Sequence, residues 1–392
     1  MIIYHKRGEK MSEKLFYKDA YIKEFDAECI SCRKEGEYFA AVLDKTAFFP
    51  EGGGQTGDTG ALNGVKVTDT QEINGEILHI LEREIPLGAV HGVLNWDKRF
   101  AKMQNHTAEH IVSGTVNKRF GLDNVGFHLG DGFVTMDYNG TLTKEDVLFL
   151  ESEVNEILWR DLPVKAYFPQ NTDGIVFRSK IDIKENLRIV EIPGVDVCAC
   201  CAPHVSSTAQ AGIIKIINSE KHKNGVRLTM KSGAFALNEM RILQKNAERI
   251  SHITSLPSEN CADGVEKLAQ KLKDAEFKIK DMQVKAVLRA AEESEKNYIF
   301  VDDASLLKDA VNALKLKFGQ PVFAFAGAGE TYRFMALCPD NVKEALQVKL
   351  NIRCGGRDGM IQGSVAQKKE DIENALKSFY FEQQCSYEWT QM

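Results

Sequence analysis

The chain has 392 residues, enough for two or three domains with cores of their own. Its 50 Lys and Arg against 56 Asp and Glu give a net charge of −6, which argues against a protein that coats nucleic acid through bulk positive charge. The sequence holds no run of about 18 apolar residues and no signal-peptide pattern, and its nine cysteines are dispersed, so we expect a cytoplasmic protein without a membrane span or a disulfide framework.

Residues 1–96 have the pattern of β structure, and we predict a β-barrel-like domain. Short apolar segments such as residues 38–43 and 77–81 are separated by Gly and Asn turns, and Asn63-Gly64 and Asn74-Gly75 are hairpin signals. The glycine run at 52–54 permits positive φ and a close approach of the backbone to a ligand. It is not a phosphate-binding loop of the Walker type, because no Lys-Ser or Lys-Thr follows. A plain hairpin turn is the alternative interpretation.

A helix is predicted from residue 98 to about residue 120, with Asp97 as its N-cap and Gly121 as the glycine that ends it. His106 and His110 lie four residues apart, so they stand one turn above each other and can direct two imidazoles at one point. A His-x-x-x-His pair alone is weak support for a metal site. Two further donors are needed.

Those donors come from the segment after a predicted strand at 189–192, which Pro193-Gly194 interrupts. Cys200 and His204 follow on a loop, and with His106 and His110 they make the ligand set and number that Zn²⁺ binds tetrahedrally. Cys198 and Cys201 are neighbouring sulfurs, and the Cys-x-x-x-His spacing favours Cys200. Residues 97–235 as a whole, with strands at 133–138, 212–217 and 225–230 and a capped helix after Thr143, predict a metal-bearing α/β domain.

A basic cluster that includes Lys215 and Arg227 fits either RNA-backbone contact or a solvated surface. Residues 236–296 keep a 3-4 spacing of apolar residues with one break at 257–264, which predicts a helical arm. The heptads fit an antiparallel hairpin or a dimer-forming arm and do not decide between them. Residues 297–392 alternate strands and helices, as in an α/β domain, and carry a glycine-rich loop at 354–364.

Several of these stretches occur in one fixed order, namely residues 44–55, 106–110, 192–196, 200–205 and 225–227. That order resembles the editing half of alanyl-tRNA synthetase and the free-standing AlaX proteins related to it. The chain departs from the family at Glu109, where Gln is usual, and at residues 201–203, where the family has Gly-Gly-Thr.

The resemblance implies an α+β fold with a zinc-dependent editing domain, and it assigns Thr46, Gly53, Gly54 and Gln55 to the substrate pocket. The glycine-rich loop with Gly355, Gly356 and Arg357 resembles that of the DHH-associated domain at the end of the same synthetases. In that family this domain contacts the tRNA body and helps dimerisation. A homodimer formed through the helical arm and the C-terminal domain is therefore one partner to consider, and Lys215 and Arg227 are further candidates for tRNA binding.

The function that follows is hydrolysis of the ester of mischarged Ser-tRNA(Ala) or Gly-tRNA(Ala), with zinc positioning water or substrate. Four protein ligands fill a tetrahedral site, so one ligand is loose, the metal becomes five-coordinate, or the metal mainly orients the substrate. Glu109 is either a general base or a solvent-facing helix residue, and the second is favoured because the family usually has an amide at this position. Because the editing motifs begin by about residue 44, we expect a trans-acting hydrolase that does not charge tRNA.

Two other functions are consistent with parts of the sequence. The first is a non-catalytic tRNA-binding protein that zinc only braces. The second is a zinc peptidase, which is disfavoured because Thr107 stands where the His-Glu-x-x-His motif needs its Glu.

Overall fold

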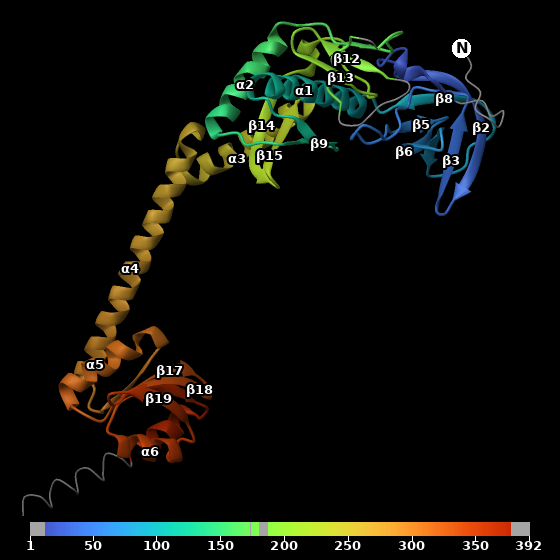
Figure 1. Ribbon diagram of the computed structural model, residues 1–392. Coiled ribbons are helices and arrows are strands. Elements are labelled where there is room, and N and C mark those ends of the chain that lie inside the picture. The colour runs from blue at the N-terminus through green and yellow to red at the C-terminus, as the bar shows by residue number, and fades with distance from the viewer. Residues whose placement is uncertain (1–11, 173, 180–186, 378–392) are drawn as a thin grey trace, which may run out of the picture. The chain divides into compact units, whose positions relative to one another are not determined.

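The structure is a computed structural model that describes residues 12–172, 174–179 and 187–377 (Figure 1). The chain divides into two compact units, Met1–Asn246 and Ala247–Met392. Both contain helices and sheets, which agrees with the predicted α+β class. The finer division at residues 96, 235 and 296 stays a prediction. Within the described ranges, no helix has the length and apolar content that a membrane crossing needs.

The N-terminal part of the first unit is a closed barrel of six strands (blue in Figure 1). All neighbouring strands are antiparallel, and their inward residues form one apolar core. Both Asn-Gly hairpin predictions are confirmed, since Asn63, Gly64, Asn74 and Gly75 all have the positive φ that such turns require. The strands in barrel order are β2 (Glu24–Glu35), β3 (Tyr38–Leu43), β7 (Glu76–Leu81), β6 (Val65–Ile73), β5 (Gly60–Leu62) and β8 (Gly88–Leu94). Outside the barrel, β1 (Glu13–Lys14) pairs with β4 (Lys45–Thr46), and a short 3-10 helix, η1 (Leu15–Tyr17), follows β1.

The central helix of the first unit is α1 (Trp96–Phe120). Gly121 ends it in the left-handed conformation, as predicted. The prediction that Asp97 caps its start is wrong. Asn95 is the N-cap, and its side chain accepts a hydrogen bond from the backbone N–H of Lys98, so the helix begins one residue before Asp97.

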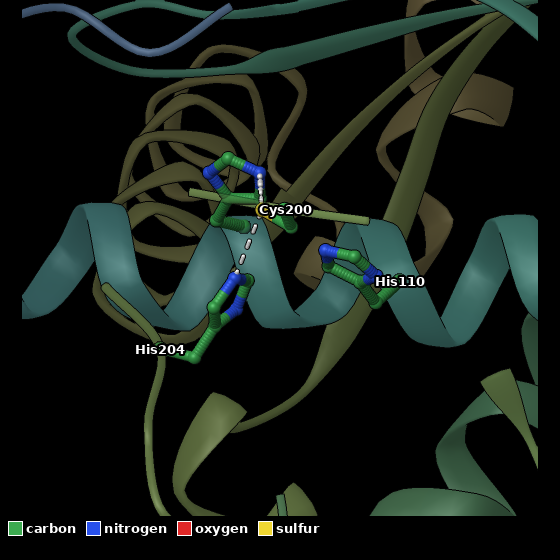
Figure 2. A group of neighbouring side chains, drawn as sticks. His110, Cys200 and His204 are labelled. Atoms are coloured by element: carbon green, nitrogen blue, oxygen red, sulfur yellow. Dashed lines mark hydrogen bonds between the residues drawn. The ribbon is translucent and has the colours of Figure 1, made fainter. Parts of the chain in front are cut away.

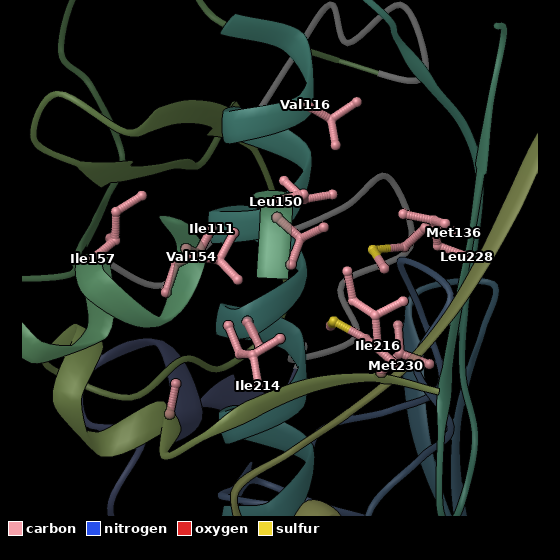
Figure 3. Close-up of a cluster of buried hydrophobic side chains, with 14 of the residues drawn as sticks. Ile111, Val116, Met136, Leu150, Val154, Ile157, Ile214, Ile216, Leu228 and Met230 are labelled. Atoms are coloured by element: carbon pink, nitrogen blue, oxygen red, sulfur yellow. The ribbon is translucent and has the colours of Figure 1, made fainter. Parts of the chain in front are cut away.

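Two sheets and a second helix cover α1. The helix is α2 (Lys144–Trp159), which begins with the capping box expected at Thr143. The larger sheet has the order β14-β15-β10-β9, and the smaller one the order β11-β12-β13. Figure 3 shows how apolar side chains of α1, α2 and the larger sheet fill one core. The strands are β9 (Asn124–Leu129), β10 (Val134–Tyr138), β11 (Lys165–Tyr167), β12 (Ile189–Ile192), β13 (Asp196–Ala199), β14 (Ile214–His222) and β15 (Gly225–Ser232), and a 3-10 turn, η2 (Thr208–Ala211), precedes β14.

The predicted helical arm consists of α3 (Gly233–Thr254), which runs across the boundary between the units, and α4 (Cys261–Glu293), with a 3-10 turn, η3 (Ser258–Asn260), between them. The second unit continues into a five-stranded sheet of order β16-β17-β18-β20-β19. Its remaining elements are β16 (Tyr298–Val301), η4 (Ala304–Leu306), α5 (Leu307–Phe318), β17 (Val322–Ala328), β18 (Thr331–Leu337), α6 (Asp340–Lys349), β19 (Arg353–Arg357) and β20 (Met360–Val365).

Candidate metal centre

The four candidate metal donors come from two distant parts of the chain. His106 and His110 project from adjacent turns of α1, and both are buried. Cys200 and His204 lie on the loop that follows β13. The structure brings these side chains together, which the spacing along the sequence alone does not require.

Packing holds that loop against the helix. The buried guanidinium of Arg188 donates hydrogen bonds to the carbonyl oxygens of Cys200 and Ala202 at 3.0 and 2.8 Å. Gly114 on α1 permits close contact with the turn between β12 and β13, because a Cβ at this position would lie only 2.6 Å from the carbonyl oxygen of Val195. The absence of a side chain on α1 therefore lets the β12–β13 turn approach the helix backbone.

The donor atoms have the spacing of a tetrahedral zinc site. The Sγ of Cys200 lies 3.5 Å from Nε2 of His106 and 3.3 Å from Nε2 of His204. For typical Zn–S and Zn–N bonds, the edge of a tetrahedron joining S to N is about 3.6 Å. Figure 2 shows His110, Cys200 and His204 directed at one another, and all four donor atoms lie within 4.8 Å of each other. The buried Nε2 of His110 has no hydrogen-bond partner among the described residues, as a nitrogen reserved for a metal would.

Each imidazole is oriented through its other nitrogen. Nδ1 of His106 lies 2.9 Å from the side-chain oxygen of Gln55, which only accepts, so Nδ1 carries the proton and Nε2 is free to bind a metal. Nδ1 of His204 lies 3.1 Å from the hydroxyl of Thr107, which also accepts the backbone N–H of Val205 at 3.3 Å. Such outer contacts fix the tautomer and the ring orientation of metal ligands.

His110 is held by a carboxylate. Its Nδ1 lies 2.8 Å from Oδ2 of Asp196, and Arg178 donates to both oxygens of the same carboxylate at 2.8 Å each. Burial lowers the pKa of His110, but the hydrogen bond to Asp196 and the neighbouring Cys198 and Cys200 together raise it more, so the pKa lies well above its ordinary value. Asp196 therefore favours positive charge on this ring, which a cation bound at Nε2 supplies as well as a proton does.

The charge state of the other donors also suits a metal. Burial raises the pKa of the Cys200 thiol, but the imidazoles of His106 and His204 lower it, and the pKa ends well below the usual value. Burial lowers the pKa of His204 to about 3. A thiolate and a neutral imidazole are the forms that coordinate zinc, so the residues present fit this ion.

Glu109 is buried, and the expectation that it faces solvent is wrong. Only 3% of its surface is exposed, because other elements cover α1 on this side too. Its Oε1 accepts hydrogen bonds from Ser113 at 2.8 Å and Asn124 at 2.7 Å, and Ser113 also contacts the hydroxyl of Tyr138 at 2.9 Å. This network holds the carboxylate at the wall of the cavity described next.

A cavity of about 450 Å³ opens beside the four donors. Gly53 and Gly54 form part of its wall with positive φ, and a Cβ at Gly54 would lie 2.6 Å from the ring of Phe127. The Sγ of Cys201 lies 3.2 Å from the position of a Cβ at Gly53. The described lining residues are Tyr17, Gly53, Gly54, His106, Glu109, His110, Phe127, Phe168, Ser179, Arg188, Cys198, Ala199, Cys200 and Cys201.

Two residues expected in the substrate pocket lie elsewhere. Thr46 is fully buried in the barrel, where its hydroxyl is 2.8 Å from Nε2 of His79. Gln55 is also fully buried and contacts His106. Neither belongs to the described lining of the cavity. Gly53 and Gly54 of the same motif line the cavity, whereas the side chain of Thr46 contacts His79 in the barrel and that of Gln55 contacts the candidate metal donor His106.

The residues expected to contact tRNA are distributed over both units. Arg227 donates to both oxygens of Asp137 at 2.6 and 2.8 Å, and Lys215 contacts Glu151 at 2.7 Å, so both cations already have an acidic neighbour. Gly355, Gly356 and Arg357 lie on β19 of the second unit.

Sequence reasoning missed the three residues that orient the metal donors and their loop, namely Thr107, Asp196 and Arg188. Asp196 is the last residue of the stretch 192–196, which carries part of the family resemblance, and this position could have indicated its role. In the sequence, Thr107 is notable only because it replaces the Glu of the His-Glu-x-x-His motif. Arg188 has no local signal, because its partners are carbonyl oxygens 12 and 14 residues away.

Comparisons with known proteins find two matching family models and several relatives. Residues 187–228, which include Cys200 and His204, match the threonyl and alanyl tRNA synthetase second additional domain, and residues 4–96 match the class II (A) tRNA synthetases. The alanyl-tRNA editing protein AlaX-M of Saccharolobus solfataricus is 35% identical over 240 residues, which are 56% of this chain and 100% of that protein. The chain belongs to the AlaX family of alanyl-tRNA editing proteins.

Longer relatives of this AlaX chain are covered only in part. AlaX-L of Pyrococcus horikoshii is 39% identical over 243 residues, 59% of this chain and 60% of that protein. An alanine–tRNA ligase of Methanococcus maripaludis is 28% identical over 392 residues, 93% of this chain and 43% of the ligase. The chain thus spans less than two thirds of the length of these two relatives.

Proposed function

We propose that this protein is a trans-acting deacylase that hydrolyses the ester of Ser-tRNA(Ala), Gly-tRNA(Ala) or both. One observation carries the proposal: four zinc-type donors converge, three of them at the wall of a cavity, in a chain that belongs to a family of alanyl-tRNA editing proteins. The choice of serine and glycine follows from the limits of a site built for alanine. Such a site cannot strongly reject a smaller side chain or one added hydroxyl, so a second, hydrolytic site is useful.

We propose zinc as the metal, held by His106, His110, Cys200 and His204. When bound, it supplies a positive charge that can polarise the ester or lower the pKa of water. Because four protein donors complete a tetrahedron, we propose that residues of the cavity wall orient the aminoacyl ester. Gly53 and Gly54 are the residues we propose to contact the aminoacyl group through their main chain, which the cavity exposes.

Glu109 is our candidate for the general base. Its carboxylate lies at the cavity wall beside two ligands, and hydrogen bonds from Ser113 and Asn124 fix its position. In the proposed reaction, water adds to the ester carbonyl carbon and gives its proton to Glu109. The bond from that carbon to the ribose oxygen then breaks, and the proton passes to the ribose oxygen as the 3′ end is released.

Deacylation of purified Ser-tRNA(Ala) and Gly-tRNA(Ala) tests the proposal. Wild-type protein is expected to release the amino acid, whereas His106→Ala and Cys200→Ala are expected to lose activity. His252→Ala is a matched control, because this exposed histidine lies on α3 outside the site. Activity that survives both site substitutions would overturn the site. If no aminoacyl-tRNA is hydrolysed and metal removal unfolds the first unit, the protein is the zinc-braced tRNA binder instead.

Contacts with the tRNA body and self-association complete the proposal. We propose that Lys215, Arg227 and the β19 residues Gly355 to Arg357 contact the tRNA backbone. We also propose a homodimer formed through α4, because heptad positions of this helix are exposed. These positions are Val265, Leu268, Leu272, Ile279 and Met282.

A further inference from the structure

The cavity is larger than the aminoacyl group that the proposed reaction requires. Its volume is about 450 Å³. A seryl group has about six non-hydrogen atoms, and at roughly 30 Å³ for each water-sized group in a liquid it occupies about 180 Å³. The cavity therefore has room for part of the nucleotide to which the amino acid is esterified.

One wall of the cavity has the chemistry of a base-binding surface. Phe168 follows β11 and lines the cavity, yet 49% of its surface is exposed. Phe168 therefore presents apolar ring surface to the cavity and to solvent, where a ligand could cover it.

The ring of Phe168 contacts a second aromatic residue that also lines the cavity. Tyr17 meets it edge to face, with ring centroids 5.3 Å apart and an interplanar angle of 77°. Tyr17 in turn contacts Phe16 with centroids 4.6 Å apart, and the guanidinium of Arg188 lies 5.1 Å from its ring centroid. Because Arg188 is anchored on the carbonyl oxygens of the metal-binding loop, Phe168 is linked by direct contacts to the element that carries Cys200.

We propose that Phe168 is the platform on which the adenine base of the substrate's terminal nucleotide stacks, with Tyr17 fixing the orientation of the platform. The inference rests on the proposed function, since it assigns a place to the nucleotide end of the same ester. Stacking suits this role because it grips the base through its π face and is worth about 5- to 100-fold in affinity for one base. It also fixes the direction in which the ester enters, with the base at the half-exposed rim and the aminoacyl group at the metal donors.

Binding of two non-hydrolysable probes tests the platform. The probes are 3′-seryl-amino-3′-deoxyadenosine, which has the base, and serinamide, which lacks it. Phe168→Ala in the zinc-loaded full chain is expected to weaken binding of the adenosine probe about 5- to 100-fold and to leave serinamide unchanged. Phe168→Tyr should retain the affinity, because it keeps an aromatic face. Phe149→Ala is the matched control: this phenylalanine of α2 is 54% exposed and lies outside the cavity lining.

A kinetic comparison separates the platform from a structural role. For the seryl ester of adenosine, Phe168→Ala should lower kcat/KM by the same factor as the affinity, whereas kcat/KM for serine methyl ester should not change. Equal losses for both probes and both esters, or no loss for the adenosine compounds, would overturn the inference. Wild-type protein that binds the adenosine probe no better than serinamide would overturn it too. Wild-type protein that binds the adenosine probe but hydrolyses no aminoacyl-tRNA would refute the proposed function and leave the platform standing.

Discussion

Replacement of Asp196 by asparagine tests whether the carboxylate behind His110 sets the affinity for metal. The substitution keeps the shape of the side chain but leaves one acceptor oxygen where there were two. If that oxygen faces His110, the new NH₂ group faces the guanidinium of Arg178; if it faces Arg178, the NH₂ group faces Nδ1 of His110. In either orientation one donor meets another donor.

The magnitude follows from the role of the contact. Loss of a partner that orients a ligand costs about 10- to 100-fold in metal affinity, or about 1.4–2.7 kcal/mol. A second effect falls on stability, because Arg178 keeps its charge after its carboxylate is gone, and breaking a buried pair costs about 3–5 kcal/mol. The side chain of Arg178 is 20% exposed, so we expect the lower end of that range.

The assay is competition for zinc against a chromophoric chelator, together with urea unfolding of the metal-free chain. Asp137→Asn is a matched control, since this aspartate also accepts both hydrogen bonds of an arginine but lies away from the metal donors. The double variant Asp196→Asn/Arg178→Met should regain stability while its zinc affinity stays low. Zinc affinity of Asp196→Asn within about twofold of wild type would refute the reasoning.

Three further predictions concern other parts of the molecule. Glu109→Gln restores the amide usual in the family and should lower the deacylation rate about 100-fold without weakening zinc binding, if the carboxylate is the base; an unchanged rate contradicts that role. Burial lowers the pKa of His79 to about 4, so the folded barrel excludes a proton that the unfolded chain takes up below about pH 6.5. The free energy of unfolding should therefore fall by about 3 kcal/mol between pH 6.5 and pH 4, and urea unfolding at a series of pH values should show a shallower fall for His79→Gln. Leu272→Glu on α4 should convert a dimer into a monomer in sedimentation experiments, whereas Lys271→Glu, at an exposed neighbouring position, should not.

The local features of the site were predictable because they depend on short segments. The helix fixes the separation of His106 and His110, and the loop fixes that of Cys200 and His204, so spacing alone indicated two pairs of donors. That the two pairs meet depends on packing between elements about 90 residues apart, and only the order of motifs shared with the editing proteins pointed to it.

The environment of Glu109 could not be predicted from helical periodicity. A periodic pattern assigns one apolar face and one polar face, and a glutamate falls on the polar face. The central turns of α1 have no exposed face, because the barrel, both sheets and α2 surround them. Even Arg99 and Lys102 are buried on this helix. Polar side chains on such a helix are paired inside the protein, as Arg99 is with Asp58.

At Cys29 and Cys32, the structure departs from regular strand alternation. Three-residue spacing on a regular strand places two side chains on opposite faces. A bulge between Cys29 and Ser31 shifts the register of β2 against β3, and both cysteines pack against the same barrel core. An inserted residue of this kind leaves no clear mark in the sequence.

The partners of the three imidazoles connect the candidate metal centre to several parts of the fold. Gln55 follows the glycine run of the barrel part, Asp196 begins β13, and Thr107 lies on α1 itself. A metal ion at the four donors would add a direct link between α1 and the loop after β13, which packing and hydrogen bonds already hold together. Without it, the buried Nε2 of His110 has no hydrogen-bond partner among the described residues, and the Sγ of Cys200 lies 3.5 and 3.3 Å from the imidazoles of His106 and His204. A bound metal ion would give His110 and Cys200 a partner in the folded state but not in the unfolded state. Tighter metal binding should therefore increase the stability of the first unit.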